Sequence, residues 1–183
     1  WKWGYDYIKG EGEGISYTAQ LTTPQEQIYG TAEKGEHYLL ETDNHVIVPV
    51  GKKVRVLTTA ADVIHAWAVP AFWIKLDAVP GKLNETSFTI EKPGVYFGQC
   101  SELCGARHGY MPIVVEAVSP QVFEQWVRAK GGTMPGDAAA APADAAGPAN
   151  TTSEMGPVEN VTAPPTTNQA ATANPAPAGN AGH

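Results

Sequence analysis

The chain has 183 residues and a formal net charge of −7, from 12 Lys and Arg against 19 Asp and Glu. Because nucleic acids are bound through clusters of Lys and Arg, this balance argues against a nucleic-acid partner and favours a basic protein partner. No window holds about 18 consecutive apolar residues, and no signal-peptide pattern is visible. The most apolar stretch, Ala60–Ile74, is interrupted by Asp62 and His65. Because the chain starts at Trp1 without a Met, we expect a mature or truncated fragment, which N-terminal membrane helices could have preceded.

Residues 1–130 carry short runs rich in Val, Ile, Thr and aromatic residues, which is the pattern of β-strands. Turn signals separate these runs at residues 49–51, 80–81 and 93–94. Because no helical segments lie between the runs, the pattern predicts an all-β domain, either an antiparallel sandwich or a barrel. The predicted strands are Ile15–Leu21, His45–Val50, Lys53–Thr59, Ile64–Val69, Glu85–Ile90, Val95–Gln99 and Ile113–Val118.

One helix is predicted after the last strand. Ser119 is suited to cap its N-terminus and Pro120 to occupy its first turn. Phe123, Trp126 and Val127 then form an apolar stripe at helical spacing. We expect this stripe to pack into the core of the domain.

The composition changes after residue 130. Residues 131–183 contain no Lys, Arg or aromatic residue, but many Ala and Pro. Such a segment cannot bury enough apolar surface to offset the entropy of ordering it. We therefore divide the chain into a β domain, residues 1–130, and a disordered, acidic, Ala- and Pro-rich tail, residues 131–183.

The segment CSELCGARHGYM, residues 100–111, gathers thiol, imidazole and thioether side chains. Cys100, Cys104 and His108 are spaced four residues apart, and Met111 follows three residues later. In a loop wound in turns, this spacing returns the side chains to one side. Ligands of these types select copper and other thiophilic metals over Mg, Ca or Mn. His65, on a predicted strand, is the best candidate for a ligand from elsewhere in the chain.

Four interpretations of this loop compete. A disulfide between Cys100 and Cys104 leaves His108 and Met111 without a role. A zinc site fits two Cys and two His, but the spacing is not that of the common zinc modules, and Met is a poor zinc ligand. A mononuclear blue-copper site takes one Cys, two His and a weak Met, so it leaves the second Cys over. Two thiolates that bridge two copper ions use every residue, which favours a dinuclear electron-transfer site.

The loop, preceded by VIHAW and FWIKLDAVPG and followed by a Pro, closely resembles the CuA domain of cytochrome c oxidase subunit II. The match runs from the opening WKWGYDY through the closing helix, over residues 1–130. The resemblance implies a cupredoxin-like Greek-key β-sandwich with one C-terminal helix. It also implies two copper ions held at six positions, which are His65, Cys100, Glu102, Cys104, His108 and Met111.

The resemblance implies how these positions share the two ions. Cys100 and Cys104 would bridge both ions. His65 and Met111 would complete the first ion. His108 and the backbone carbonyl of Glu102 would complete the second.

Further roles come from the same resemblance. The side chain of Glu102 would help to hold a Mg²⁺ ion at the interface with oxidase subunit I. Trp1 would be the exposed aromatic ring where an electron from cytochrome c enters. Asp6, Asp43 and Asp62 would dock the lysines of cytochrome c, which would raise the association rate and make it fall with salt.

The implied function is electron transfer within a cytochrome c oxidase, from cytochrome c to a haem in subunit I, where oxygen is reduced to water. We expect no catalytic residue in the chain and no turnover from it alone, because it has neither a haem-attachment motif nor a nucleophile–base pair. The implied location is the periplasmic face of a bacterial cytoplasmic membrane, or the intermembrane-space side of the mitochondrial inner membrane. The alternatives are the copper domain of nitrous-oxide reductase, a quinol-oxidase subunit II and a copper chaperone.

Overall fold

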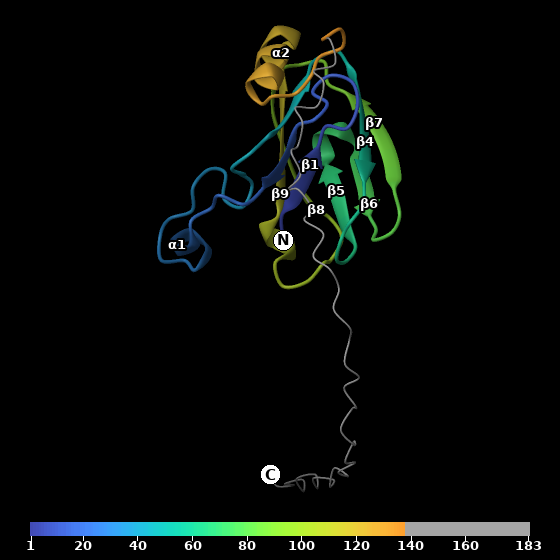
Figure 1. Cartoon of the computed structure of the whole chain (residues 1–183). Coiled ribbons are helices and arrows are strands. Elements are labelled where there is room, and N and C mark those ends of the chain that lie inside the picture. The colour runs from blue at the N-terminus through green and yellow to red at the C-terminus, as the bar shows by residue number, and fades with distance from the viewer. Residues whose placement is uncertain (138–183) are drawn as a thin grey trace, which may run out of the picture. The chain divides into compact units, whose positions relative to one another are not determined.

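The computed structural model describes residues 1–137, which form a mostly β domain (Figure 1). Two α-helices, α1 Gln25–Ile28 and α2 Pro120–Ala129, and two 3-10 turns, η1 Pro70–Phe72 and η2 His108–Tyr110, accompany the strands. No helix in the described part of the chain is long and apolar enough to cross a membrane. The strands are β1 Trp3–Asp6, β2 Ser16–Ala19, β3 Val46–Pro49, β4 Lys53–Thr58, β5 His65–Val69, β6 Ile74–Ala78, β7 Asn84–Thr89, β8 Gly94–Cys100 and β9 Pro112–Val118.

Five strands form the main sheet, in the order β3-β9-β8-β5-β6, while β4 pairs with β7 and β1 pairs with β2. The main core lies between the five-stranded sheet and the β4–β7 pair, where Trp67 of β5 and Phe88 of β7 stack with ring centroids 6.1 Å apart. Central strands such as β5 and β9 are buried along most of their length because both of their faces are covered. The predicted β-sandwich is therefore confirmed.

The antiparallel prediction is wrong for one pair, because β3 and β9 run parallel, from Val46 opposite Val115 to Pro49 opposite Val118. Two parallel strands cannot be joined by a tight hairpin, and here nearly the whole sandwich connects them. A local turn signal therefore carries no information about this pairing. Strands β1 and β6 were also not predicted, and β6 is an edge strand that follows the 3-10 turn η1.

Helix α2 forms as predicted. The Ser119 side chain accepts a hydrogen bond from the backbone N–H of Val122, and Pro120 is its first residue. Phe123 and Val127 are buried in a second cluster with Ile15. Each such side chain contributes about 1.5–3 kcal/mol when it is fully buried, so this stripe holds the helix against the domain.

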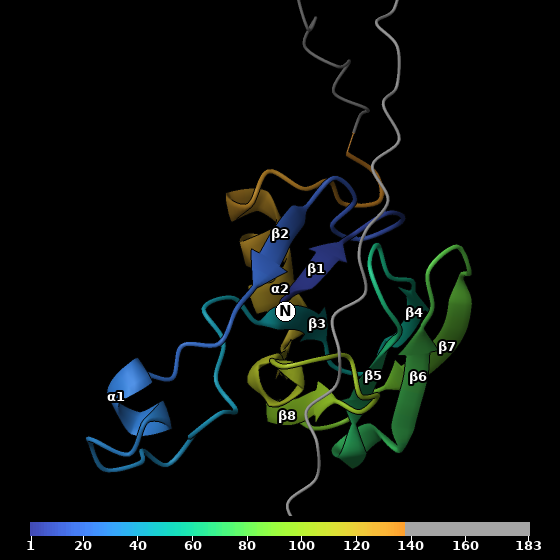
Figure 2. The ribbon, with the colours of Figure 1, turned by 90° about the horizontal axis from the view of Figure 1, so that it is seen from below.

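We call residues 20–45 the α1 segment, and the sequence analysis predicted no helix or strand within residues 22–44 of it. These residues carry the four-residue helix α1 and project from the sheets, as both ribbon views show (Figures 1 and 2). His45 ties the end of this segment to the sheet. Its Nε2 lies 2.7 Å from Glu41 and its Nδ1 lies 3.0 Å from Glu116 of β9.

The two carboxylates also govern the protonation of His45. Burial alone would lower the pKa of this imidazole, but the hydrogen bonds to Glu116 and Glu41 outweigh burial and raise the pKa above its ordinary value. The sequence analysis assigned no partner to His45, because these carboxylates come from two different parts of the chain.

The predicted tail begins with residues that contact the domain. The backbone N–H of Thr133 donates to the carbonyl of Glu13, and Met134 packs against the cluster around α2. The rest of the predicted tail, residues 138–183, lies outside the described residues. The division of the chain at residue 130 therefore stays a prediction.

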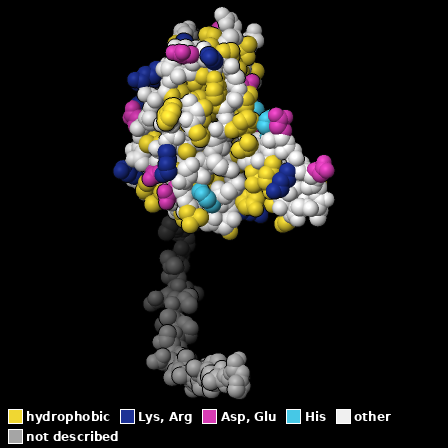
Figure 3. Space-filling view, turned by 180° about the vertical axis from the view of Figure 1, so that it is seen from behind, with side chains coloured by type: hydrophobic (Ala, Val, Ile, Leu, Met, Phe, Trp, Pro, Cys, Tyr) yellow, Lys and Arg dark blue, Asp and Glu magenta, His cyan; other side chains and the backbone are white. Residues whose placement is uncertain are grey.

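Charged side chains of both signs are interspersed with hydrophobic ones over the face seen in Figure 3. No patch of one sign dominates this face.

Candidate metal centre

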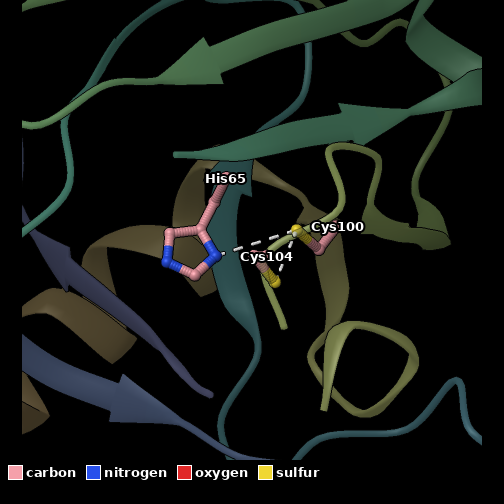
Figure 4. Close-up of side chains that lie close together, drawn as sticks. All are labelled: His65, Cys100 and Cys104. Atoms are coloured by element: carbon pink, nitrogen blue, oxygen red, sulfur yellow. Dashed lines mark hydrogen bonds between the residues drawn. The ribbon is translucent and has the colours of Figure 1, made fainter. Parts of the chain in front are cut away.

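The candidate metal centre lies where the ends of β5 and β8 meet the loop that leads to β9. His65 is the first residue of β5, and Cys100 is the last residue of β8. The two strands approach closely because β8 has glycine at position 98, where an added Cβ would lie 2.1 Å from the carbonyl oxygen of Ala68. This close pairing brings His65 and Cys100 to the same site, together with Cys104 from the loop (Figure 4).

The two cysteines are buried and free, with their Sγ atoms 3.8 Å apart. A disulfide bond is roughly 2.0 Å long, so the structure does not support the disulfide interpretation. Both sulfurs can contact one metal ion, because metal–thiolate bonds are about 2.3 Å long. The Nδ1 atom of His65 lies 3.9 Å from Cys100 Sγ. One ligand atom from each of these three residues lies within 4.8 Å of the other two, a grouping that is compatible with copper.

The loop supplies the other predicted ligand atoms. His108 Nδ1 and Met111 Sδ each lie 3.6 Å from the Sγ of Cys104. The backbone carbonyl oxygen of Glu102 lies 3.4 Å from the Sγ of Cys100. The structure therefore brings together all six positions that the sequence analysis selected.

Asp62 orients the histidine of β5. Its Oδ1 lies 2.9 Å from the Nε2 atom of His65, on the side of the ring away from the sulfurs. This hydrogen bond holds the pKa of Asp62 below its ordinary value. When Nε2–H donates to a carboxylate, the lone pair of Nδ1 is left free for a metal ion. The sequence analysis treated Asp62 only as a docking residue and missed this contact.

Trp3 is a second supporting residue that the sequence analysis missed. Its indole N–H donates to the carbonyl of Met111 at 3.1 Å, and its ring meets the imidazole of His65 edge-on with centroids 6.0 Å apart. The sequence analysis gave Trp3 no role at the metal centre. The available signal was the alternation of aromatic residues in the opening WKWGYDY, but that pattern does not show what a buried ring contacts.

Burial raises the pKa of the Cys104 thiol to about 11, and the neighbouring Cys100 adds to this effect. The thiol is therefore protonated at neutral pH in the metal-free protein. Thiolate is the form that binds a metal, so metal binding releases this proton.

Trp1 lies on the metal loop. Its indole N–H donates to the carbonyl of Cys104 at 3.1 Å, while the residue is 51% exposed. The ring lies over Gly105, where an added Cβ would be 2.8 Å from the indole. Glycine at this position thus allows the ring to rest on the loop, and φ of +119° there is also a conformation that favours glycine.

The predicted acidic residues occupy different settings. Among the described residues, Asp62 is the one docking candidate that contacts a predicted metal ligand. Asp6 lies on β1 and accepts a hydrogen bond from Ser16, and Asp43 lies in the α1 segment and accepts one from the N–H of Gln20.

The side chain of Glu102 points away from the sulfur ligands toward a surface cation. Its carboxylate lies 3.7 Å from the ammonium of Lys75 on β6, and the same ammonium lies 3.1 Å from Asp77. All three side chains are about half exposed. In this arrangement Lys75 supplies the positive charge beside Glu102.

A β-sandwich that holds buried thiols, imidazoles and a thioether at one end defines a protein with a soft-metal site. Residues 1–118 match the family model described as the periplasmic domain of cytochrome c oxidase subunit II. Cytochrome c oxidase subunit 2 of Cyanidium caldarium is 47% identical over 133 residues, which cover 71% of this chain and 50% of the relative. The same subunit of Metridium senile is 46% identical over 127 residues, which cover 69% and 49%.

Similar solved structures include two that contain a subunit II domain. The first is the periplasmic domain of subunit II of cytochrome oxidase of Bradyrhizobium japonicum, with a TM-score of 0.62, 42% identity, and coverage of 72% of this chain and 86% of that one. The second is the mixed disulfide intermediate between the thioredoxin-like protein TlpAs and subunit II of cytochrome c oxidase. Its TM-score is 0.55, its identity is 41%, and the coverage is 70% and 82%.

The chain therefore belongs to the cytochrome c oxidase subunit II family, and it spans about half the length of the curated relatives it matches. The cupredoxin-like fold implied by the sequence is confirmed. The comparisons do not favour nitrous-oxide reductase or a copper chaperone.

Proposed function

We propose that this domain receives electrons from cytochrome c at a two-copper centre and passes them to a haem in oxidase subunit I. The observation that carries this proposal is the convergence of six ligand positions on two free thiols 3.8 Å apart. When bound, the copper pair supplies a carrier that shares one electron between two ions. In the intact complex this electron contributes to the reduction of oxygen to water and to proton pumping, while the chain alone performs no turnover.

The polypeptide supplies a rigid ligand frame. Cys100 and Cys104 would hold both copper ions, His65 and Met111 would complete the ligand set of one, and His108 with the carbonyl of residue 102 would complete that of the other. Both cysteines and Met111 are almost fully buried, so water is kept from the sulfur ligands. Ligands that are held in place before and after electron transfer reorganise little, which favours a fast reaction.

Trp1 is the proposed point at which the electron enters. Its half-exposed ring is joined to the backbone of Cys104 by one hydrogen bond, which links the surface directly to a bridging ligand. Asp62, beside His65, supplies negative charge close to this surface, and Asp6 and Asp43 supply the rest of the proposed docking charge. Such carboxylates attract a basic cytochrome c and make association weaker as salt increases.

Glu102 is the proposed Mg²⁺ ligand at the contact with subunit I. Its carboxylate is exposed and therefore available to a partner subunit, but Lys75 lies beside it. Mg²⁺ would compete with the Lys75 ammonium for this carboxylate, because the two cations repel each other. The domain itself is proposed to lie at the periplasmic face of a bacterial membrane, or in the mitochondrial intermembrane space, held by helices that precede residue 1.

The test is to reconstitute the 183-residue chain with copper, and to measure copper per chain together with the electron paramagnetic resonance spectrum. We expect two copper ions per chain and hyperfine splitting from two equivalent copper nuclei. Cys104→Ser serves as the comparison, because it removes one bridging sulfur and would leave a mononuclear spectrum. One copper per chain in the unaltered protein, or binding of zinc in preference to copper, would contradict the proposal.

A further inference from the structure

The side chain of Gln99 lies between the ligand loop and the α1 segment. Gln99 precedes Cys100 on β8, and because side chains alternate along a strand it points to the opposite face of the sheet. Its Nε2 atom lies 3.3 Å from the carbonyl oxygen of Leu39 and 3.3 Å from the carbonyl oxygen of Gly109. One carboxamide thus bridges two segments that are far apart in sequence.

Gly109 belongs to the part of the loop that carries two proposed ligands. It is the middle residue of η2, which starts at His108, and Met111 follows that turn directly. No side chain caps the start of η2. The hydrogen bond from Gln99 therefore connects this short turn to the rigid sheet at the residue between the two ligands.

Leu39 forms the other end of the bridge and has an unusual backbone. Its φ is +60°, a left-handed conformation that is unfavourable for a residue with a branched side chain. The N–H of Leu39 donates to the hydroxyl of Thr23 at 2.9 Å, while its carbonyl accepts from Gln99. Nearby, the ring of His37 packs against the ring of Phe97 of β8, with centroids 4.9 Å apart and an interplanar angle of 39°. The α1 segment is thus held against the outer face of β8 at this point.

The amide of Gln99 acts only as a donor. Its Oε1 atom is buried and has no partner among the described residues, although burial of an unpaired carbonyl is unfavourable. Both of its partners are carbonyl oxygens, which only accept hydrogen bonds. A glutamate carboxylate has nearly the same shape but no N–H to donate, so it cannot replace this amide.

We propose that Gln99 is a positioning residue that clamps the carbonyls of Gly109 and Leu39 together and thereby fixes His108 and Met111 relative to the two thiols. The effect of this clamp on a copper site rests on the proposed function, whereas the two hydrogen bonds of the clamp are present in the metal-free protein. Because the α1 segment also carries Asp43, the clamp joins a proposed docking segment to the ligand loop.

The first test uses the full chain without metal and measures backbone hydrogen exchange. Gln99→Glu and Gln99→Met both remove the two donors, and Gln125→Glu on the exposed face of α2 makes the same chemical change away from the site. We expect exchange to rise about tenfold in residues 37–40 and 106–111 of both Gln99 variants, as the loss of two hydrogen bonds predicts. Strands β4 and β7 should stay protected, and the Gln125 variant should match the original protein.

Unchanged exchange in both segments would overturn the clamp, and so would an equal rise across all strands, since that pattern indicates general destabilisation. A measurement without any variant covers the case in which the substituted proteins do not fold. In the unaltered chain, the side-chain amide protons of Gln99 should exchange more slowly than those of Gln125. Equal exchange rates at the two amides would also overturn the clamp.

The second test adds copper and separates the clamp from the proposed function. If the copper proposal holds, the Gln99 variants should still bind two ions, but with an altered paramagnetic resonance spectrum and a shifted reduction potential. A spectrum and potential identical to those of the unaltered protein would overturn the positioning role. Failure of the unaltered chain to bind two ions would instead refute the copper function, and the exchange experiment would still decide the clamp.

Discussion

Replacement of Gly98 by Ala should break the contact between β5 and β8 on which the metal centre depends. The added Cβ would lie 2.1 Å from the carbonyl oxygen of Ala68 and 2.9 Å from a methyl carbon of Val69. Ordinary contact needs at least 3.4 Å, so the strands would have to separate by more than 1 Å. Because a backbone carbonyl in a central strand cannot rotate away, we expect a cost of about 3–5 kcal/mol from overpacking and lost ladder hydrogen bonds.

Urea unfolding of the metal-free protein, followed by tryptophan fluorescence, measures this cost as a lower midpoint at an unchanged slope. Gly4→Ala is the matched control, because Gly4 also lies in a strand but has nothing within 4 Å of an added Cβ. Gly98→Ala should also bind copper more weakly than the original protein, since separation of the strands moves His65 away from Cys100. A loss of less than about 1 kcal/mol for Gly98→Ala would refute the argument, because small effects of that size are typical of uncrowded sites.

Three further substitutions test separate features. Because the pKa of His45 is raised in the folded state, its stabilising contribution should be complete below about pH 6.5, the unfolded value, and lost as pH rises through the folded value. Urea titrations at a series of pH values should therefore show a free energy of unfolding that declines above that pH in the original protein but not in His45→Gln. Parallel plots of unfolding free energy against pH for the two proteins would contradict this prediction. Asp62→Ala should weaken copper binding about 10- to 100-fold, because the ring of His65 is no longer held in one orientation. Asp6→Ala serves as the control and should leave copper affinity unchanged. Equal copper affinities of Asp62→Ala and the original protein in a competition assay would show that the orientation of this ring is unimportant. Trp73→Gly should stabilise the domain by about 0.5 kcal/mol, because Trp73 is 98% exposed at a φ of +57°, and a lower urea midpoint would show that its ring packs.

Asp62 now has two proposed roles that one substitution affects together. Its contact with His65 concerns the metal ligand, whereas its charge concerns the approach of a basic partner. The two roles respond differently to salt, because an association rate set by charge falls with ionic strength while a hydrogen bond to a buried ring is screened much less. Copper affinity and the salt dependence of cytochrome c association therefore report the two roles separately.

Features that depend on residues close together in the chain could be predicted from the sequence. The ligand loop was recognisable because Cys100, Cys104, His108 and Met111 lie within twelve residues, so their spacing alone predicts convergence. Helix α2 was predictable for the same reason, since the cap, the first-turn proline and the apolar stripe are local. Seven of the nine strands in the described residues followed from short β-rich runs between turn signals.

Contacts between residues from distant parts of the chain could not be predicted in this way, because tertiary packing fixes them. The parallel pairing of β3 with β9, the contact of Trp3 with Met111, and the bridge from Gln99 to Leu39 all join segments that carry no shared local pattern. Such contacts depend on strand register and on how closely two backbones approach each other. At this site the close approach of β5 and β8 is possible because residue 98 is glycine. Five of the six proposed ligand positions therefore lie in one short segment of the sequence, whereas the packing of the whole sandwich sets where all six lie in space.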